Sequence, residues 1–229
     1  MRERKVPEVV VPDEMVAQWQ GLVSALADLS NTPSCLVMRI DGEDIEVFAA
    51  SCNQGNPYRP GDREHLLNSG LYCETVVSSK RPLHVPDALS DPEWQANPDV
   101  KLGMVAYLGL PILFPDGTPF GTICLLDSKP TPYGEAVRTV LDGLCSLIES
   151  HLAVLYMNAA LGEKNADLLA YLDELQALRG LIAICCQCKR IRDPDGAWNP
   201  VETYLVRHPG AEFTHGYCPE CYERAMREE

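Results

Sequence analysis

Residues 104–126 read MVAYLGLPILFPDGTPFGTICLL, and this stretch decides the fold of the chain. Two apolar runs, 104–114 and 120–126, flank the turn residues Pro115-Asp116-Gly117-Thr118. Proline, aspartate and glycine are residue types that favour a tight turn between two strands. We therefore predict a β-hairpin and, with it, a sheet that is mainly antiparallel.

A second hairpin is predicted upstream, because the strand-like runs 34–40 and 45–51 flank Asp41-Gly42, residue types that tolerate positive φ. A helix precedes it, with Asp13 as a candidate N-cap and apolar residues at helical spacing up to Asn31. Between the hairpins the sequence predicts a loop over 53–62, a short helix capped by Asp62, a helix over 71–79 and a strand over 82–85. The sheet and these interspersed helices make an α+β domain.

From about Gly134 the apolar pattern becomes helical and continues to about residue 179. At 1.5 Å per residue such a helix is roughly 65–70 Å long, more than one small domain needs. We expect its apolar stripe to pack first on the sheet domain and then against a second copy, giving a homodimer through a coiled coil. The alternative is a break at Gly162 and a hairpin of two helices.

Composition and charge exclude several classes of function. The 229 residues carry a formal net charge of −14, which disfavours nucleic acids as partners. The start of the chain has no secretory apolar segment, and no apolar run reaches the ~18 residues that cross a bilayer. We therefore expect a cytoplasmic protein without membrane contact. Disulfides are rare in that compartment, so the ten cysteines need another explanation.

Several blocks in the first two thirds of the chain together resemble the GAF family. They are residues 70–76 (GLYCETV), 81–87 (RPLHVPD), 97–103 (NPDVKLG), 107–112 (YLGLPI) and 120–127 (FGTICLLD). The resemblance implies a six-stranded antiparallel sheet with helices on one face. It also implies a pocket on the other face, roofed by the segment around residues 86–103. A bacterial sensory protein that binds a small effector is the function implied, with the effector left open.

Six residues are candidates for the effector pocket. Tyr72, Cys73, Trp94 and Tyr107 would line it, and Asp87 and Lys101 would be its polar anchors. This choice follows the rule that ligand pockets are mostly apolar and contain a few placed polar groups. Each residue also has a plain structural alternative as core, lid packing or solvated surface.

Two Cys-x-x-Cys pairs near the end of the chain are its most specific chemical feature. Cys185, Cys188, Cys218 and Cys221 supply four thiolates, the ligand set of a tetrahedral structural zinc site. The segment 181–229 is too short to fold on apolar burial alone, so a metal would supply folding energy. Iron with the same ligands is the minor alternative. The segment also resembles a cysteine-containing tail of bacterial signalling proteins.

The sequence therefore predicts a non-catalytic sensor in three parts: a GAF domain over 1–133, a signalling and dimerisation helix over 134–180 and a four-cysteine domain over 181–229. An effector would act through the helix on a tail that contacts a protein partner. One alternative is a redox or metal sensor that uses the four-cysteine site. Another is a thiol-dependent reductase acting through Cys73 or Cys124. A lowered thiol pKa in an open pocket would favour the reductase, and full burial of both thiols would argue against it.

Overall fold

The computed structural model describes residues 9–179, 182–193, 195–207 and 226–227. The chain divides into two compact units, Met1–Lys164 and Asn165–Glu229, and each is described by itself. The elements of the first unit are α1 (Asp13–Ser30), β1 (Ser34–Asp41), β2 (Asp44–Ala50), β3 (Arg63–His65), α2 (Tyr72–Ser79), β4 (Leu83–Val85), α3 (Pro98–Lys101), β5 (Ala106–Leu113) and β6 (Pro119–Asp127). The helix α4 (Glu135–Arg179) begins in this unit, and β7 (Ile191–Arg192), β8 (Trp198–Asn199) and α5 (Val201–Arg207) belong to the second.

The first unit is built on a six-stranded sheet with the order β3-β2-β1-β6-β5-β4. Every neighbouring pair in it is antiparallel, so the predicted α+β class and sheet are confirmed. Both predicted hairpins are present, as β1–β2 and β5–β6. Their turns contain Gly42 and Gly117, whose positive φ values of 65° and 80° glycine adopts without a steric penalty.

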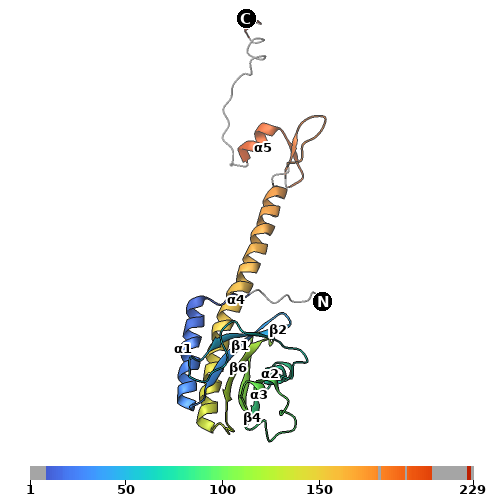
Figure 1. Ribbon diagram of the computed structural model, residues 1–229. Helices are drawn as coiled ribbons and strands as arrows, with labels where there is room; N and C mark the ends of the chain where they lie inside the picture. Colours follow the sequence, from blue (N-terminus) through green and yellow to red (C-terminus); the bar gives the residue numbers. More distant parts are fainter. Residues whose placement is uncertain (1–8, 180–181, 194, 208–225, 228–229) are drawn as a thin grey trace. The chain divides into compact units, whose positions relative to one another are not determined.

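Helices α1 and α4 lie side by side on one face of the sheet (Figure 1). The core on this face is apolar, and its largest fully buried side chain is Trp19 of α1. The indole Nε1 of Trp19 donates a hydrogen bond to Nδ1 of His151 on α4 at 3.1 Å, which joins the two helices. Leu141, Ile148 and Leu152 of α4 are buried in the same core. The predicted packing of the long helix on the sheet is therefore confirmed.

The opposite face of the sheet carries α2, α3 and the loops around them (Figure 1). Its core includes an aromatic stack in which Tyr72 lies between Trp94 and Tyr107, with ring centroids 5.2 and 4.6 Å away. Tyr107 points its ring over Gly109, where a Cβ would overlap the tyrosine hydroxyl. Glycine at this position therefore sets the direction of Tyr107 in the strand.

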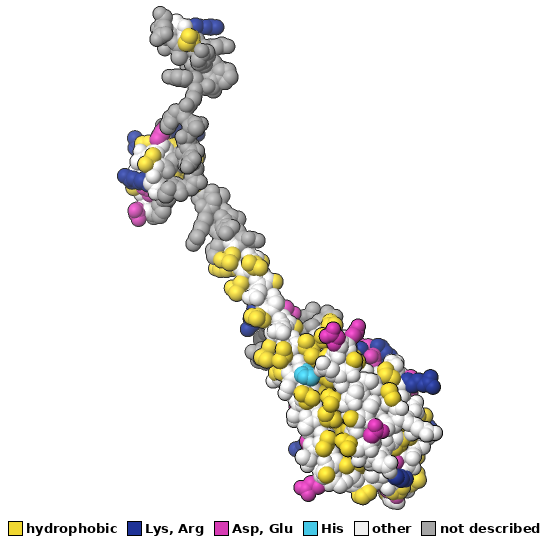
Figure 2. All heavy atoms as spheres, turned by 90° about the vertical axis from the view of Figure 1, so that its left-hand side faces the viewer, with side chains coloured by type: hydrophobic (Ala, Val, Ile, Leu, Met, Phe, Trp, Pro, Cys, Tyr) yellow, Lys and Arg dark blue, Asp and Glu magenta, His cyan; other side chains and the backbone are white. Residues whose placement is uncertain are grey.

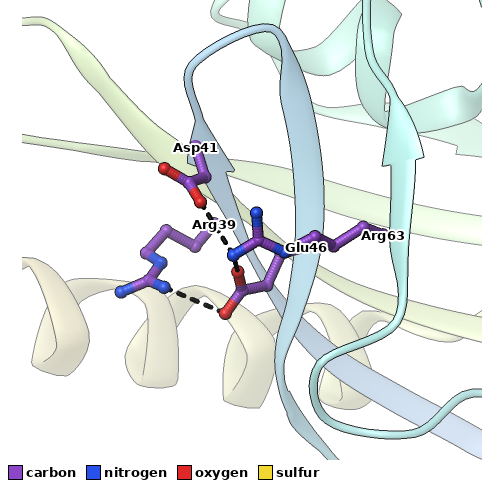
Figure 3. Close-up of polar contacts among 4 residues, drawn as sticks. All are labelled: Arg39, Asp41, Glu46 and Arg63. Atoms are coloured by element: carbon purple, nitrogen blue, oxygen red, sulfur yellow. Dashed lines mark hydrogen bonds and ion pairs between the residues drawn. The ribbon is translucent and has the colours of Figure 1, made fainter.

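The short helix expected after Asp62 is not formed, and this prediction was wrong. Residues 63–65 are instead the edge strand β3, which pairs with β2. Arg63 places its guanidinium 2.7 Å from Glu46 of β2 and 2.8 Å from Asp41 of β1, and Arg39 reaches the other Glu46 oxygen at 2.9 Å (Figure 3). These ion pairs across three strands favour the extended conformation over a local helix, because Glu46 is largely buried and needs both cations.

The long helix α4 is continuous from Glu135 to Arg179, and Gly162 does not break it. The prediction of one helix is therefore confirmed over that of a helical hairpin. By length and composition the part Glu135–Leu172 would suffice to cross a membrane. Part of this apolar character is used in packing, because Leu141, Ile148 and Leu152 are buried in the core of the first unit.

Candidate functional site

A cavity of about 510 Å³ lies on the face of the sheet opposite α1 and α4. Strands β1, β2, β5 and β6 form its floor, and α2, α3 and the loop before β3 form its walls. The volume is in the range of small-molecule pockets in proteins. Its lining residues are Leu36, Met38, Ile45, Val47, Pro57, Tyr58, Asp62, Arg63, Glu64, Leu71, Cys73, Pro98, Asp99, Lys101, Leu102, Tyr107, Cys124 and Leu126.

A buried carboxylate, that of Asp99, is the main polar group of the cavity. Its side chain is 8% exposed, and the hydroxyl of Tyr58 donates a hydrogen bond to its Oδ1 at 2.7 Å. Burial raises the pKa of Asp99, the Tyr58 hydrogen bond acts against that change, and nearby Glu64 adds to it. Burial and the Asp99 charge together raise the pKa of Tyr58, so its hydroxyl remains a donor. A ligand that donates a hydrogen bond or carries a positive charge would therefore complement this carboxylate.

Local sequence explains why Asp99 points into the cavity. Asn97 caps α3 by accepting a hydrogen bond from the Asp99 backbone N–H at 2.9 Å, and Pro98 occupies the first helical position. The Asn97 amide also donates to the carbonyl oxygen of Gly70 at 2.7 Å. The cap thus ties the segment that bears Asp99 to the turn before α2, so that both walls of the cavity are held together.

The rim of the cavity is charged. Asp62, Arg63, Glu64 and Lys101 all line it. Arg63 is already held by Glu46 and Asp41, as Figure 3 shows, so its charge is largely compensated. Lys101 is exposed and is therefore the cation at the rim that is available to a ligand.

Three of the six predicted pocket residues line the cavity, namely Cys73, Lys101 and Tyr107. Tyr72 and Trp94 do not, because they stack behind Tyr107 as buried core. Within the described part of the chain the Tyr72 hydroxyl has no hydrogen-bond partner.

Asp87, predicted as a polar anchor, does not line this cavity. Its carboxylate accepts a hydrogen bond from the backbone N–H of Leu89 at 3.0 Å and another from the Ser90 hydroxyl. It therefore stabilises the turn after β4 and does not line the cavity.

The predicted roof over 86–103 contributes only its last part, Pro98 to Leu102. The loop 53–62, which the sequence marks only by its asparagine, glycine and proline content, supplies Pro57, Tyr58 and Asp62. Sequence reasoning missed Tyr58 and Asp99 as site residues. The Asn97-Pro98-Asp99 cap was the available signal for Asp99, because it fixes the backbone of that residue at the start of α3.

In the second unit a tight turn surrounds the first cysteine pair. The backbone N–H of Cys185 donates to the Arg190 carbonyl at 2.8 Å, and that of Lys189 donates to the Cys185 carbonyl at 3.0 Å. The backbone N–H groups of Cys188 and Gln187 hydrogen-bond to the Cys185 sulfur and lower the pKa of its thiol. Donors aimed at a sulfur favour a thiolate, the form that binds metal.

Cys218 and Cys221, the other two predicted metal ligands, lie outside the described residues. Among the residues that the structure does describe, no three histidine, cysteine, aspartate or glutamate side chains are grouped closely enough to hold a metal ion. Cys185 and Cys188 thus form half of the proposed ligand set. The zinc site stays a prediction.

Comparison with known proteins agrees with this architecture. The diguanylate cyclase DgcP of Escherichia coli (strain K12) is 34% identical over 86 residues, which make up 37% of this chain and 25% of the cyclase. The alignment thus spans a quarter of the length of that relative.

Two solved structures share the fold at low identity. A methyl-accepting chemotaxis protein, residues 122 to 287, matches with a TM-score of 0.52 and 14% identity, over 63% of this chain and 90% of that one. The chromophore-binding domain of the bacteriophytochrome RpBphP3 from R. palustris matches with a TM-score of 0.50 and 15% identity, over 62% and 57%. At these identities the likeness shows the fold alone.

A family model for the GAF domain matches residues 15–152, more than half of the chain. That range runs from α1 through the whole six-stranded sheet into the first half of α4. Domains of this kind are typical of sensory and signalling proteins. The chain therefore belongs to the GAF domain family.

Proposed function

We propose that this protein is a non-catalytic cytoplasmic sensor whose first unit binds a small effector in the cavity beside Asp99. The observation that carries the proposal is a cavity of about 510 Å³ with apolar walls and one buried carboxylate. A buried carboxylate is costly unless something pairs with it, and within the described chain Tyr58 is the one side chain that hydrogen-bonds to it. An effector with an amino or hydroxyl donor would supply the second partner.

The charges around the cavity limit the chemical class of the effector. Asp62, Glu64 and Asp99 are acidic, and Arg63 is already paired with other carboxylates. Among the described residues that line the cavity, Lys101 at the rim is the remaining cation. This arrangement favours a cationic or zwitterionic small molecule with an apolar body over an anion.

Replacing Asp99 by asparagine is expected to weaken effector binding about thirtyfold or more, since losing one partner of a buried charge pair costs roughly 2–5 kcal/mol. The probe is a panel of small primary amines, free amino acids included, tested by thermal shift and then by calorimetry on the full chain. The carbonyl oxygen of the new amide would still accept the Tyr58 hydrogen bond, so the unbound variant should melt no lower than the wild type.

Asp87→Asn is the matched control, because Asp87 accepts local turn hydrogen bonds away from the cavity. It should leave the affinity of every amine unchanged. Equal affinities for wild type and Asp99→Asn would overturn the assignment of the anchor. A native mass spectrum of the protein purified without chelator would show any effector that copurifies.

The proposed relay is a homodimer through α4. Val140, Leu147, Val154 and Leu161 are exposed apolar residues of the first unit and recur every seven residues. Figure 2 shows hydrophobic side chains gathered along the exposed side of this helix. A seven-residue apolar repeat is the pattern of two helices that pack as a coiled coil. A second copy of the chain, which carries the same stripe, is the occupant that fits it.

Leu161→Glu should therefore convert the protein from a dimer to a monomer of 25.3 kDa. The charge would have to enter an apolar seam, which is unfavourable. Light scattering coupled to size exclusion measures the mass directly. Ala166→Glu, off the stripe on the same helix, should remain a dimer. A wild-type chain that is monomeric at tens of micromolar would refute the proposed dimer.

The second unit is proposed to be a zinc-stabilised tail that contacts a protein partner. The turn at Cys185 and Cys188 supports this, because its backbone donors point at sulfur as they do around metal-bound thiolates. The effector would have to bind one state of the helix more tightly than the other. Only then would its binding change the surface that the tail presents to a partner.

A further inference from the structure

Two cysteine side chains line the same cavity. Cys73, in the first turn of α2, and Cys124, on β6, both line it. Cys73 is 7% exposed and Cys124 is fully buried, so the cavity is their route to small molecules. They come from segments 51 positions apart in the sequence, and the packing of α2 on β6 brings them together.

The sulfur of Cys73 is surrounded by hydrogen-bonding groups. The hydroxyl of Thr122 donates to it at 3.3 Å, and the hydroxyl of Tyr107 lies 3.6 Å away. The first turn of a helix adds unpaired backbone N–H groups, which favour a negative charge. The neighbouring Cys124 thiol is the largest cause of the lowered pKa of Cys73, with the Thr122 and Tyr107 hydroxyls acting in the same direction, while burial and the Asp99 charge oppose it.

The two sulfurs have different surroundings. The Thr122 hydroxyl donates to Cys73, whereas Cys124 is fully buried, and its interaction with Cys73 together with burial raises the pKa of its thiol. One nucleophilic thiolate next to one neutral thiol is the arrangement in which oxidation of the first is followed by attack of the second.

Other buried cysteines of the first unit lack this arrangement. Burial raises the pKa of Cys35, on the opposite face of the sheet. Burial also raises the pKa of Cys145 on α4, whose thiol donates to the Pro111 carbonyl at 3.3 Å. These two residues are internal controls for burial without activation.

We propose that Cys73 and Cys124 form a dithiol switch that a small hydroperoxide closes from inside the cavity. The Cys73 thiolate attacks the outer oxygen of the peroxide, the O–O bond breaks, and the alkoxide or hydroxide takes up a proton. Cys73 is then a sulfenic acid. Cys124 attacks its sulfur, the S–O bond breaks, and the hydroxide leaves as water with the Cys124 proton. Two thiols and ROOH thus give one disulfide, ROH and water.

Such a disulfide would join α2 to β6 across the cavity wall and so change the site that the effector occupies. The cavity gives a small peroxide access to both sulfurs, whereas their burial keeps out a protein reductant. The pair therefore fits a switch better than a rapidly turning-over reductase. The switch needs only the cavity and the two thiols, whatever the effector is.

The test is site-resolved oxidation of the full chain with hydrogen peroxide. After quenching, free thiols are alkylated under denaturing conditions and peptides are mapped by mass spectrometry, so that reactions of the tail cysteines are read separately. A Cys73–Cys124 linked peptide is expected, formed about tenfold or more faster than oxidation of Cys35 or Cys145. Cys73 reacting at the rate of those two controls would overturn the proposal.

Two variants separate the steps. In Cys124→Ser, Cys73 should stop at the sulfenic acid, which dimedone traps, because the second thiol is missing. Thr122→Val keeps the shape of the side chain but removes a donor to the Cys73 sulfur, and should slow the reaction about tenfold. Two results together would show that Cys73 and Cys124 are ordinary core residues. The rate of Cys73 oxidation would be unchanged in Thr122→Val, and the oxidised wild type would contain no Cys73–Cys124 linked peptide.

Discussion

Replacing Gly121 by alanine should cost about 3–5 kcal/mol of the free energy of unfolding of the first unit. Gly121 lies in β6 between β1 and β5, where it pairs with Arg39 and Ile112. A Cβ at this position would overlap the backbone carbonyl of Met38 on β1. No rotamer change relieves an overlap with backbone, so the two central strands would have to separate. Urea denaturation followed by far-ultraviolet circular dichroism measures the loss.

Gly143→Ala is the matched control for this experiment. Gly143 is exposed on α4, and a Cβ there would meet no atom within 4 Å. Alanine should therefore stabilise the helix by about 0.5–1 kcal/mol. If both variants melted like the wild type, the register of β1 against β6 would be wrong. The floor of the cavity, which depends on that register for Cys124 and Leu126, would then be wrong too.

The sheet and the long helix could be predicted because their signals are local. Asp41-Gly42 and Pro115-Asp116-Gly117-Thr118 are turn sequences between apolar runs, and both hairpins formed where they predict. The three-and-four spacing of α4 likewise depends on neighbours in sequence, and Leu141, Ile148 and Leu152, which follow that spacing, are buried in the core. Patterns of this kind can be recognised without knowing which residues contact them from distant parts of the sequence.

The edge strand β3 and the cavity anchors depend on distant partners, which sequence patterns do not show. The segment 63–65 is short and charged. It forms a strand because Arg63 makes an ion pair with Glu46 of the neighbouring strand β2. Asp99 is polar within a four-residue helix, and it becomes the buried anchor because Tyr58, 41 positions away, supplies its hydrogen bond. Asp87 offers the same carboxylate in a turn, and hydrogen bonds within that turn satisfy it. The Asn97-Pro98 cap marks the start of α3 in the sequence, but only the distant Tyr58 shows that Asp99 is the buried anchor.

If a structural metal holds the second unit together, removing one of its ligands should cause the largest loss of order of any single substitution in the chain. The purified protein should contain about one zinc ion per chain, and Cys188→Ser should contain almost none. Structural zinc supplies roughly 10–16 kcal/mol in small zinc-finger peptides, and a segment of this size has too little apolar surface to replace it. Metal analysis, combined with limited proteolysis, should show loss of zinc and rapid cleavage after residue 180. The melting of the first unit should not change.

The neighbouring cysteine provides the control that distinguishes a metal site from a merely thiol-rich tail. Cys186 is exposed beside Cys185, but only Cys185 lies three positions before Cys188 and receives the backbone hydrogen bonds of the turn. Cys186→Ser should therefore keep its zinc and its resistance to protease, whereas Cys185→Ser should lose both. A coloured protein with iron in place of zinc would support the metal-sensor alternative, because four thiolates hold either ion. Metal-free protein that resists cleavage as well as the purified form would refute the metal site, because the tail would then owe its order to packing alone.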